Sequence, residues 1–162
     1  DPPVSFDDWM LALHVLSAFS YVAGLVLFWV LIVAARRTDT PERTLSFAPF
    51  TKVGNAAVGI GAGGTIVLGI FLAFSVGDYD IWDPWIVAAL VLWFVAAGLG
   101  QRTGKAYLVP VQKAQELNAA GQTGPNSELL ALNRTSQGLM LQFFASLVLV
   151  LILADMIWKP GA

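Results

Sequence analysis

The chain has 162 residues, of which 57% are hydrophobic and 12% are charged, whereas about 25% of the residues in a soluble domain are charged. Low charge combined with long apolar runs is typical of a membrane protein. The net charge of −2 and the lack of a basic patch exclude nucleic acid as an expected partner. Because the sequence contains no cysteine, disulfides, cysteine-ligated zinc, iron–sulfur clusters and thiol catalysis are also excluded.

Four apolar segments are long enough to cross a bilayer, since a transmembrane helix needs about 20 apolar residues. Helices are expected because an apolar segment in lipid must satisfy its backbone hydrogen bonds internally. The sequence therefore predicts an all-α membrane protein, a four-transmembrane-helix up-down bundle that forms a single domain over residues 1–162. The expected transmembrane helices cover residues 9–35, 53–76, 85–109 and 129–158.

Capping residues and prolines mark the ends of these helices. Ser5 precedes Asp8 by three residues, which predicts a capping box, and Pro84 suits the first turn of the third helix. The third helix is expected to extend beyond the membrane, with a kink or break at Pro110. After a glycine turn, the fourth helix is expected to begin in water, capped by one of two residues, Asn126 or Ser127.

Basic residues predict the orientation of the bundle. Eight of the nine lie in the connections at one side: Arg36, Arg37, Arg43, Lys52, Arg102, Lys105, Lys113 and Arg134. The positive-inside rule assigns that side to the cytoplasm, so both termini are expected outside and residues 101–133 form a cytoplasmic helical extension. The outer helix ends carry a predicted aromatic belt of Trp9, Trp82, Trp85 and Trp158. The short outer connection predicts that the second and third helices are antiparallel neighbours.

The second transmembrane helix contains the glycine-rich stretch GNAAVGIGAGGTIVLG. Gly59 and Gly63 form a GxxxG motif, and Gly61 and Thr65 continue a row of small residues that lets helix backbones approach closely. Three roles fit this pattern: packing inside the bundle, a dimer face, or space beside a flat ligand such as a haem ring or a quinone. The motif by itself does not choose between them.

His14, the only histidine, lies five residues inside Trp9, roughly 7 Å below the outer boundary. Ionisable residues within a membrane are candidates for functional sites. Met10 lies one turn away on the same face, and Asp155 and Met156 of the fourth helix are expected at a similar depth. A carboxylate that holds one imidazole nitrogen is common around metal and haem ligands. In the simpler interpretation, His14 and Asp155 pair with each other, with the backbone or with interfacial water.

The number and type of available ligands indicate which metals this site would hold. A single histidine does not supply the three protein ligands usual in a zinc enzyme. His14 with Met10 and Met156 suits Cu(I), because imidazole and thioether groups are soft ligands. Haem needs one or two axial ligands, and two chains related by a two-fold axis would each present one His14. The sequence shows no Walker motif, serine triad or HExxH motif, so no catalytic residue is assigned.

Three segments, WMLALHVLSAFSYVAGLVLF, DYDIWDPWIVAALVLWFVAAGLG and LVLILADMIWKPGA, resemble a bacterial family of integral membrane proteins of unknown function. That family is related to the copper resistance protein D membrane domain and to the HemJ-type protoporphyrinogen oxidases. In the HemJ-type proteins an essential histidine of the first helix is implicated in haem b binding. His14 matches that histidine, and Gly24 and Leu25 match the Gly-Leu pair that follows it.

The resemblance implies a multi-pass protein of the bacterial inner membrane that binds haem b near the outer face. The HemJ-type oxidases also need a lysine at the outer start of the third helix, where this chain reads DPWIVAAL. The resemblance therefore implies haem binding at His14 and does not extend to protoporphyrinogen oxidation.

Three functions remain as expectations from the sequence. The first is a haem b-binding redox or accessory subunit with His14 as axial ligand and Gly59, Gly63 and Asp155 beside the cofactor. The second is a copper-handling membrane protein that uses Met10, His14 and Met156. The third is a non-catalytic structural subunit that packs in lipid through the glycine-rich second helix, in a homodimer or a larger membrane complex.

Overall fold

The computed structural model describes residues 4–75 and 79–161, and all regular secondary structure in these ranges is helical. The helices are α1 (Phe6–Ala35), α2 (Pro41–Ser46), α3 (Ala48–Ser75), α4 (Pro84–Ala119), α5 (Ser127–Asn133) and α6 (Ser136–Trp158). Within the described residues, four segments are long and apolar enough to span a membrane: α1, α2–α3, α4 and α5–α6. The predicted all-helical membrane architecture is confirmed, although the expected end of the second span at Val76 lies outside the described residues.

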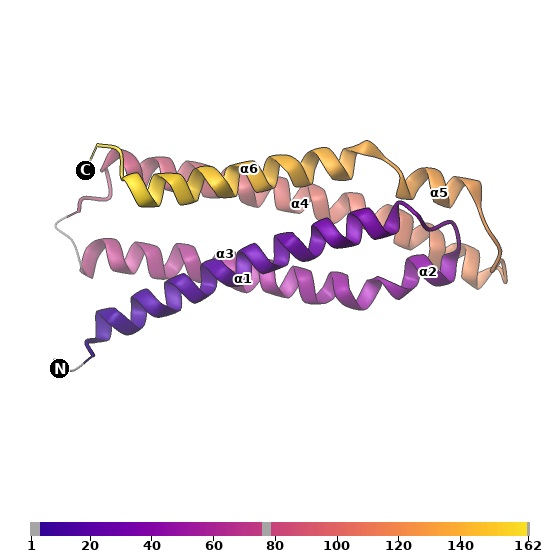
Figure 1. The fold of residues 1–162 in the computed structure, drawn as a ribbon, viewed down its shortest axis with the longest axis horizontal. Coiled ribbons are helices and arrows are strands. Elements are labelled where there is room, and N and C mark those ends of the chain that lie inside the picture. The colour runs from indigo at the N-terminus through magenta and orange to yellow at the C-terminus, as the bar shows by residue number, and fades with distance from the viewer. Residues whose placement is uncertain (1–3, 76–78, 162) are drawn as a thin grey trace.

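The four long helices run along one axis as an elongated bundle, and the two ends of the chain lie at the same end of it (Figure 1). α1 packs mainly on α3, and α4 packs mainly on α6, so the bundle consists of two helix pairs. α1 and α6 meet where Trp29 donates to Ser146 (2.9 Å) and Gln142 donates to the carbonyl of Leu25 (2.9 Å). Toward the chain termini, α1 diverges from α6 (Figure 1).

The second and third transmembrane helices, expected as antiparallel neighbours, are in contact, but α3 and α4 touch only lightly. Their main contact is a hydrogen bond from Trp93 Nε1 to the carbonyl of Ala62 (3.1 Å). The physical reason is that glycines on α3 allow it to pack closely on α1 instead, as described below. The short connection between α3 and α4 therefore does not make them the most closely packed pair of helices.

The residues predicted at the starts of three helices are confirmed, whereas the second span, predicted from residue 53, begins earlier, with α3 at Ala48. Ser5 caps α1 in a reciprocal capping box, in which Asp8 N donates to Ser5 Oγ (3.2 Å) and Ser5 N donates to Asp8 Oδ2 (2.9 Å). Pro84 is the first residue of α4, where its missing N–H leaves no hydrogen bond unmade. Of the two caps expected for the fourth helix, Asn126 is the one used, accepting a hydrogen bond from Leu129 N (3.0 Å).

The sequence predicts a kink or a break of the third helix at Pro110. The helix does not break there, because α4 continues to Ala119. Proline removes one backbone hydrogen bond and crowds the preceding turn, but packing fixes the helix on both sides of it. Thr103 before the proline and Ala114 and Leu117 after it are all buried. Tertiary contacts therefore outweigh the local cost of the proline.

The segment 129–158 forms two helices where the sequence predicts one. α5 ends at Asn133, and α6 begins at Ser136. At the break, Arg36 Nη1 donates to the carbonyl of Arg134 (2.8 Å) and to that of Thr135 (3.3 Å). The guanidinium thus satisfies carbonyls that helical hydrogen bonds would otherwise use.

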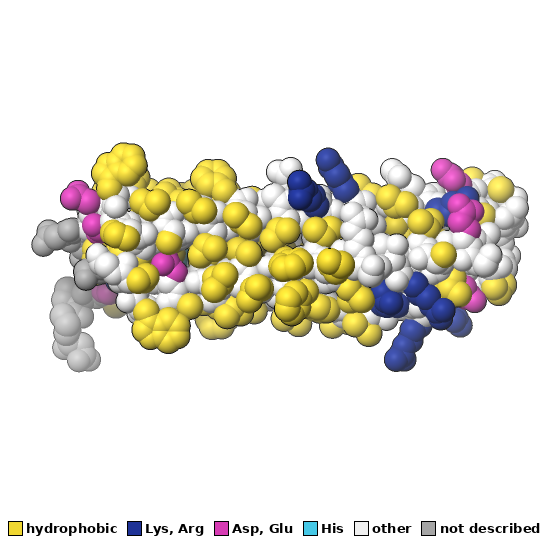
Figure 2. All heavy atoms as spheres, turned by 90° about the horizontal axis from the view of Figure 1, so that it is seen from above, with side chains coloured by type: hydrophobic (Ala, Val, Ile, Leu, Met, Phe, Trp, Pro, Cys, Tyr) yellow, Lys and Arg dark blue, Asp and Glu magenta, His cyan; other side chains and the backbone are white. Residues whose placement is uncertain are grey.

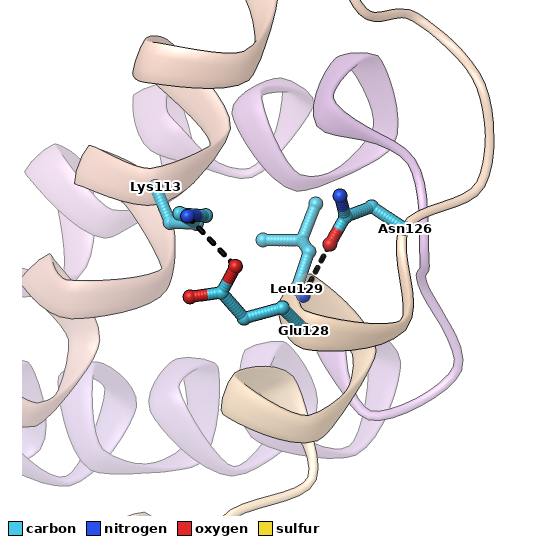
Figure 3. A network of polar contacts seen from close by, with 4 residues as sticks. All are labelled: Lys113, Asn126, Glu128 and Leu129. Carbon is cyan, nitrogen blue, oxygen red and sulfur yellow. Dashed lines mark hydrogen bonds and ion pairs between the residues drawn. The ribbon is translucent and has the colours of Figure 1, made fainter.

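A small cap covers the end of the bundle opposite the chain termini. It consists of α2, α5 and the last turns of α4, with an apolar centre of Leu45, Ala114, Leu117 and Leu129. The sequence did not predict α2. Lys113 on α4 forms an ion pair with Glu128 on α5 (2.8 Å), beside the capping bond of Asn126 (Figure 3).

Buried polar groups fasten the same cap. Asn133 Nδ2 on α5 lies within hydrogen-bond distance of Thr38 O (3.1 Å), Thr38 Oγ1 (3.1 Å) and Thr44 Oγ1 (3.2 Å). All three residues are less than a tenth exposed. These bonds join the α1–α2 connection to α5, which are about 90 residues apart in the sequence, so the cap holds the two helix pairs together.

Three of the four tryptophans expected in the aromatic belt have exposed side chains. Trp9, Trp82 and Trp158 are exposed, whereas Trp85 is 6% exposed and packs edge-on against Tyr79 (ring centroids 5.2 Å apart). Lys159 Nζ lies over both of these rings and bonds to the Tyr79 hydroxyl (3.2 Å). Trp85 therefore belongs to the packing between α4 and the end of α6, and its exposure to the membrane interface was wrongly predicted.

Candidate functional site

His14 lies in the contact between α1 and α3, half-buried, with its ring against Gly69. A Cβ atom added at Gly69 would lie 3.1 Å from His14 Cε1 and 3.5 Å from Nδ1. The imidazole also approaches the backbone of Thr65. Glycine at position 69 thus provides the space into which the imidazole packs.

The Nδ1 atom of His14 is buried and has no hydrogen-bond partner among the described residues. An unpartnered polar atom in an apolar surrounding costs free energy, and the penalty is greatest where lipid excludes water. Imidazole nitrogens are also the commonest metal ligands in proteins. His14 therefore offers one buried nitrogen that meets no hydrogen-bond criterion among the described residues, with the backbone of Thr65 as a polar neighbour in the fold.

Gly61 shows how closely the backbones of α1 and α3 approach each other. A Cβ atom at Gly61 would lie 2.7 Å from the carbonyl oxygen of Ser17 and 2.7 Å from Tyr21 Cα, and closer still to Tyr21 N. Gly24 of α1 faces Val58 in the same way, at 2.6 Å from Cγ2. This face of α3 is therefore used for packing within the chain.

Gly59 and Gly63, the predicted GxxxG pair, lie on a different face of α3. A Cβ atom at either position would meet no atom within 4 Å. Neither glycine contributes to the contact with α1 that holds His14. The row through Gly61 packs inside the bundle, while the GxxxG pair leaves an open surface.

Asp155 lies on α6 and is 9% exposed, with its Oδ2 atom buried and unpartnered among the described residues. Nδ1 of His14 and Oδ2 of Asp155 are therefore not bonded to each other. α6 lies along α4, and at this end of the bundle α1 diverges from α6 (Figure 1). The predicted meeting of Asp155 and Met156 with His14 and Met10 therefore has no hydrogen bond to support it among the described residues, and it stays a prediction.

A metal site built from several ionisable groups is not seen. In residues 4–75 and 79–161, no group of three or more His, Asp or Glu side chains is arranged to hold a metal ion. Among the predicted site residues, Nδ1 of His14 and Oδ2 of Asp155 are buried and unbonded in the described part of the chain, while Met10 is half-buried.

A groove between α3 and α4, with α1 and α6 at its floor, is a feature that the sequence reasoning missed. Its volume is about 420 Å³. Six of the wall residues are small: Gly59, Ala62, Ala96, Ala97, Gly100 and Gly104; larger residues of α3 and α4, among them Val58 and Trp93, complete the walls. Gly100 and Gly104 form a second GxxxG pair, which lines the groove together with Gly59 of the first pair, and this spacing was a signal in the sequence that could have indicated the groove.

A shallower depression of about 440 Å³ lies on another face of α4. It is lined by apolar residues around Gly98 and by the basic residues Arg102 and Lys105. Gly98 has open space at its Cβ position, as Gly100 does. The two glycines therefore lie two residues apart on α4 but face different surfaces.

Comparison of the chain with known proteins finds no match. No protein-family model matches the chain, and neither a curated protein nor a solved structure matches it.

Proposed function

We propose that this protein is a haem b-binding redox or accessory subunit of a bacterial inner membrane, with His14 as the axial ligand. The observation that carries the proposal is the buried Nδ1 atom of His14, which has no hydrogen-bond partner among the described residues. Gly69 supports it, because the absence of a side chain there gives the imidazole its space. The resemblance of the first helix to the HemJ-type proteins points to the same residue.

Of the predicted site residues, His14 is the one that fits a haem iron. His14 supplies one nitrogen ligand, which is the minimum for haem ligation, and bound haem would supply one-electron redox chemistry. An added Cβ at Gly59 or Gly63 meets no atom of the imidazole within 4 Å, and Asp155 makes no hydrogen bond to His14 among the described residues, so we assign these three residues no role in holding the iron. A second ligand would come from His14 of another copy across a two-fold axis, which makes a homodimer part of the proposal.

We also infer that both termini lie outside the cell and that the cap lies in the cytoplasm. On the face shown in Figure 2, the Lys and Arg side chains lie over the half of the molecule away from the chain termini. Exposed tryptophans Trp9, Trp82 and Trp158 lie toward the termini. Basic residues on one side and aromatic residues at the boundary are the usual signals of orientation.

The test is an absorption spectrum of the purified protein, expressed with sufficient haem, in oxidised and reduced states. The wild type is expected to show a Soret band. The His14→Ala variant is expected to retain at most about one tenth of the haem, because it loses the axial ligand. The matched control is Ser20→Ala, which removes a polar contact of α1 with α3 (Ser20 Oγ to the Ala57 carbonyl, 3.1 Å) but no ligand. It should keep the spectrum of the wild type.

Addition of imidazole separates loss of ligation from loss of folding. Rescue of the Soret band in His14→Ala by free imidazole would support the assignment of His14. A wild type that stays colourless after haem reconstitution, or a His14→Ala variant with an unchanged spectrum, would refute it.

A further inference from the structure

The groove between α3 and α4 has features that packing within the chain does not explain. One wall carries Gly59 and the other carries the GxxxG pair Gly100 and Gly104, and these three glycines have no atom within 4 Å of an added Cβ position. Small residues in membrane helices normally serve close helix contacts. Here they line open space instead, while Trp93 bridges the two helices at one end of it.

The floor of the groove holds a buried amide. Gln142 of α6 is 1% exposed and lines the groove. Its Nε2 donates to the carbonyl of Leu25 (2.9 Å), and no hydrogen bond among the described residues uses its Oε1. Nε2 uses one of its two hydrogens on Leu25, and Oε1 is left as a free acceptor for a ligand.

The position of the groove indicates where its ligand comes from. Trp85 and Gln101 on α4 are separated by 16 residues, or about 24 Å of helix, and the groove extends along α4 from Trp93 to Gly104. It therefore reaches from the middle of the apolar length to the level of the first basic residues. A ligand would enter sideways from the lipid.

The lining also sets the chemistry of the ligand. None of the described residues that line the groove is charged, so a neutral ligand is favoured. Glycine and alanine walls leave a slot suited to a flat ring, and the volume of about 420 Å³ lies within the range of small-molecule sites. The free Oε1 of Gln142 calls for a hydroxyl donor.

We propose that the groove between α3 and α4 binds a flat, neutral, membrane-dissolved ring that carries a hydroxyl group, of the quinol class, with its hydroxyl donating to Gln142 Oε1. The groove does not contain His14, although Tyr21 at its wall lies on the same helix, seven residues further along. The proposal is therefore independent of haem binding at His14.

The experiment titrates the full-length protein in detergent with decylubiquinol, held reduced, by calorimetry, and subtracts the heat of titration into empty micelles. We expect saturable binding of one ligand per chain. Gly100→Leu should weaken the binding by about tenfold or more, because the side chain fills the slot. The matched control is Gly98→Leu on the same helix, which should bind as the wild type does.

Two further variants keep the test decisive if Gly100→Leu fails to fold, as judged by circular dichroism and size-exclusion chromatography. Gly59→Leu narrows the groove from the opposite wall and should also weaken binding. Gln142→Leu should abolish the preference for decylubiquinol over decylubiquinone, because only the reduced form donates a hydrogen bond.

Three results would overturn the proposal. The first is equal binding by Gly98→Leu and Gly100→Leu, and the second is heat that never saturates. The third is a groove occupied by a second copy of the chain. In that case Gly59→Leu and Gly100→Leu would convert an oligomer to a monomer in light scattering, and the wild type would bind no quinol.

Discussion

At the scale of single residues, the glycines of α3 divide into two functional groups according to what lies opposite them. Gly61 lies directly against the backbone of α1, whereas Gly63 faces open space. Two positions that are one turn or less apart, and identical in type, therefore have opposite tolerance for a side chain.

This difference gives a stability prediction. Gly61→Ala should destabilise the protein by about 1–3 kcal/mol, the usual cost of overpacking, because the methyl group would push α1 away from α3. Gly63→Ala should change stability by less than about 1 kcal/mol, since alanine is the better helix former. Unfolding in mixed detergent micelles, followed by circular dichroism, measures both. Equal stability of the two variants would show that α1 and α3 do not pack as described.

The unpartnered polar atoms also belong to the residue scale. Three side-chain nitrogen or oxygen atoms that are themselves shielded from solvent have no partner in the described part of the chain: His14 Nδ1, Trp85 Nε1 and Asp155 Oδ2. Buried polar groups are nearly always hydrogen-bonded, so each exception calls for an explanation. For His14 our explanation is ligation. Trp85 and Asp155 lie on the neighbouring helices α4 and α6, and the structure gives no account of their lack of partners.

At the scale of elements, the spacing of the exposed side chains on α3 indicates which face of this helix contacts lipid. Exposed apolar residues recur every seven positions, and they are Val53, Ile60, Val67 and Phe74. This period places them along one face of the helix. Side chains of this size, exposed together on a soluble protein, would promote association, so the face is expected to contact lipid.

The junction of α5 and α6 depends on a single side chain from another element. Arg36 donates to the carbonyls of Arg134 and Thr135, and Arg134 Nε donates back to the carbonyl of Arg36 (3.3 Å). The two arginines thus join the end of α1 to the start of α6. Arg37, the next residue, is exposed.

Removal of this link should loosen the junction. Arg36→Ala should make local opening near Arg134 about tenfold more frequent, because losing a hydrogen bond to a charged group costs at least about 1.4 kcal/mol. Hydrogen exchange of peptides covering residues 130–140 is the measurement. Arg37→Ala is the matched control and should leave exchange unchanged; the same increase in both variants would mean that only charge matters.

At the scale of the whole molecule, the two helix pairs and the cap place the basic residues and the chain termini at opposite ends. The exposed apolar surface between these ends is what a bilayer would cover. The inferred orientation follows from this arrangement.

The natural lack of cysteine makes the orientation directly testable. Single-cysteine variants carry Asp80→Cys near the termini or Asn118→Cys in the cap, and both positions are exposed. In intact spheroplasts, a membrane-impermeant maleimide should label the Asp80→Cys variant, and the Asn118→Cys variant should react only after lysis. The reverse pattern would show that the orientation is inverted.

The long helices could be predicted because apolar length, caps and prolines are local properties of the sequence. The capping box at Ser5 and the start at Pro84 are read within a few residues. The continuation of α4 through Pro110, the break after Asn133 and the formation of α2 were missed, because each depends on packing against distant segments. The break, for example, is filled by a guanidinium about 100 residues away.

The candidate site was predictable to a smaller extent. The sequence singled out His14 because an ionisable residue in an apolar helix is costly, and the structure places its Nδ1 in a buried position without a partner. A similar predicted depth does not by itself place two residues together, and no hydrogen bond in the described part of the chain joins Asp155 to His14. Depth is set by position along one helix, whereas proximity also depends on how the helices cross.

The sequence by itself thus determined the membrane class, the four spans, their caps and the single histidine, because hydrophobicity and capping act over one or two helical turns. The tertiary structure was needed to show which glycines pack against α1 and which line open space. It was also needed to show that α3 and α4 leave a groove with Gln142 at its floor. Lipid supplies no hydrophobic drive between helices. Helix pairing is therefore decided by the shape of facing surfaces, and residues far apart in the sequence form those surfaces.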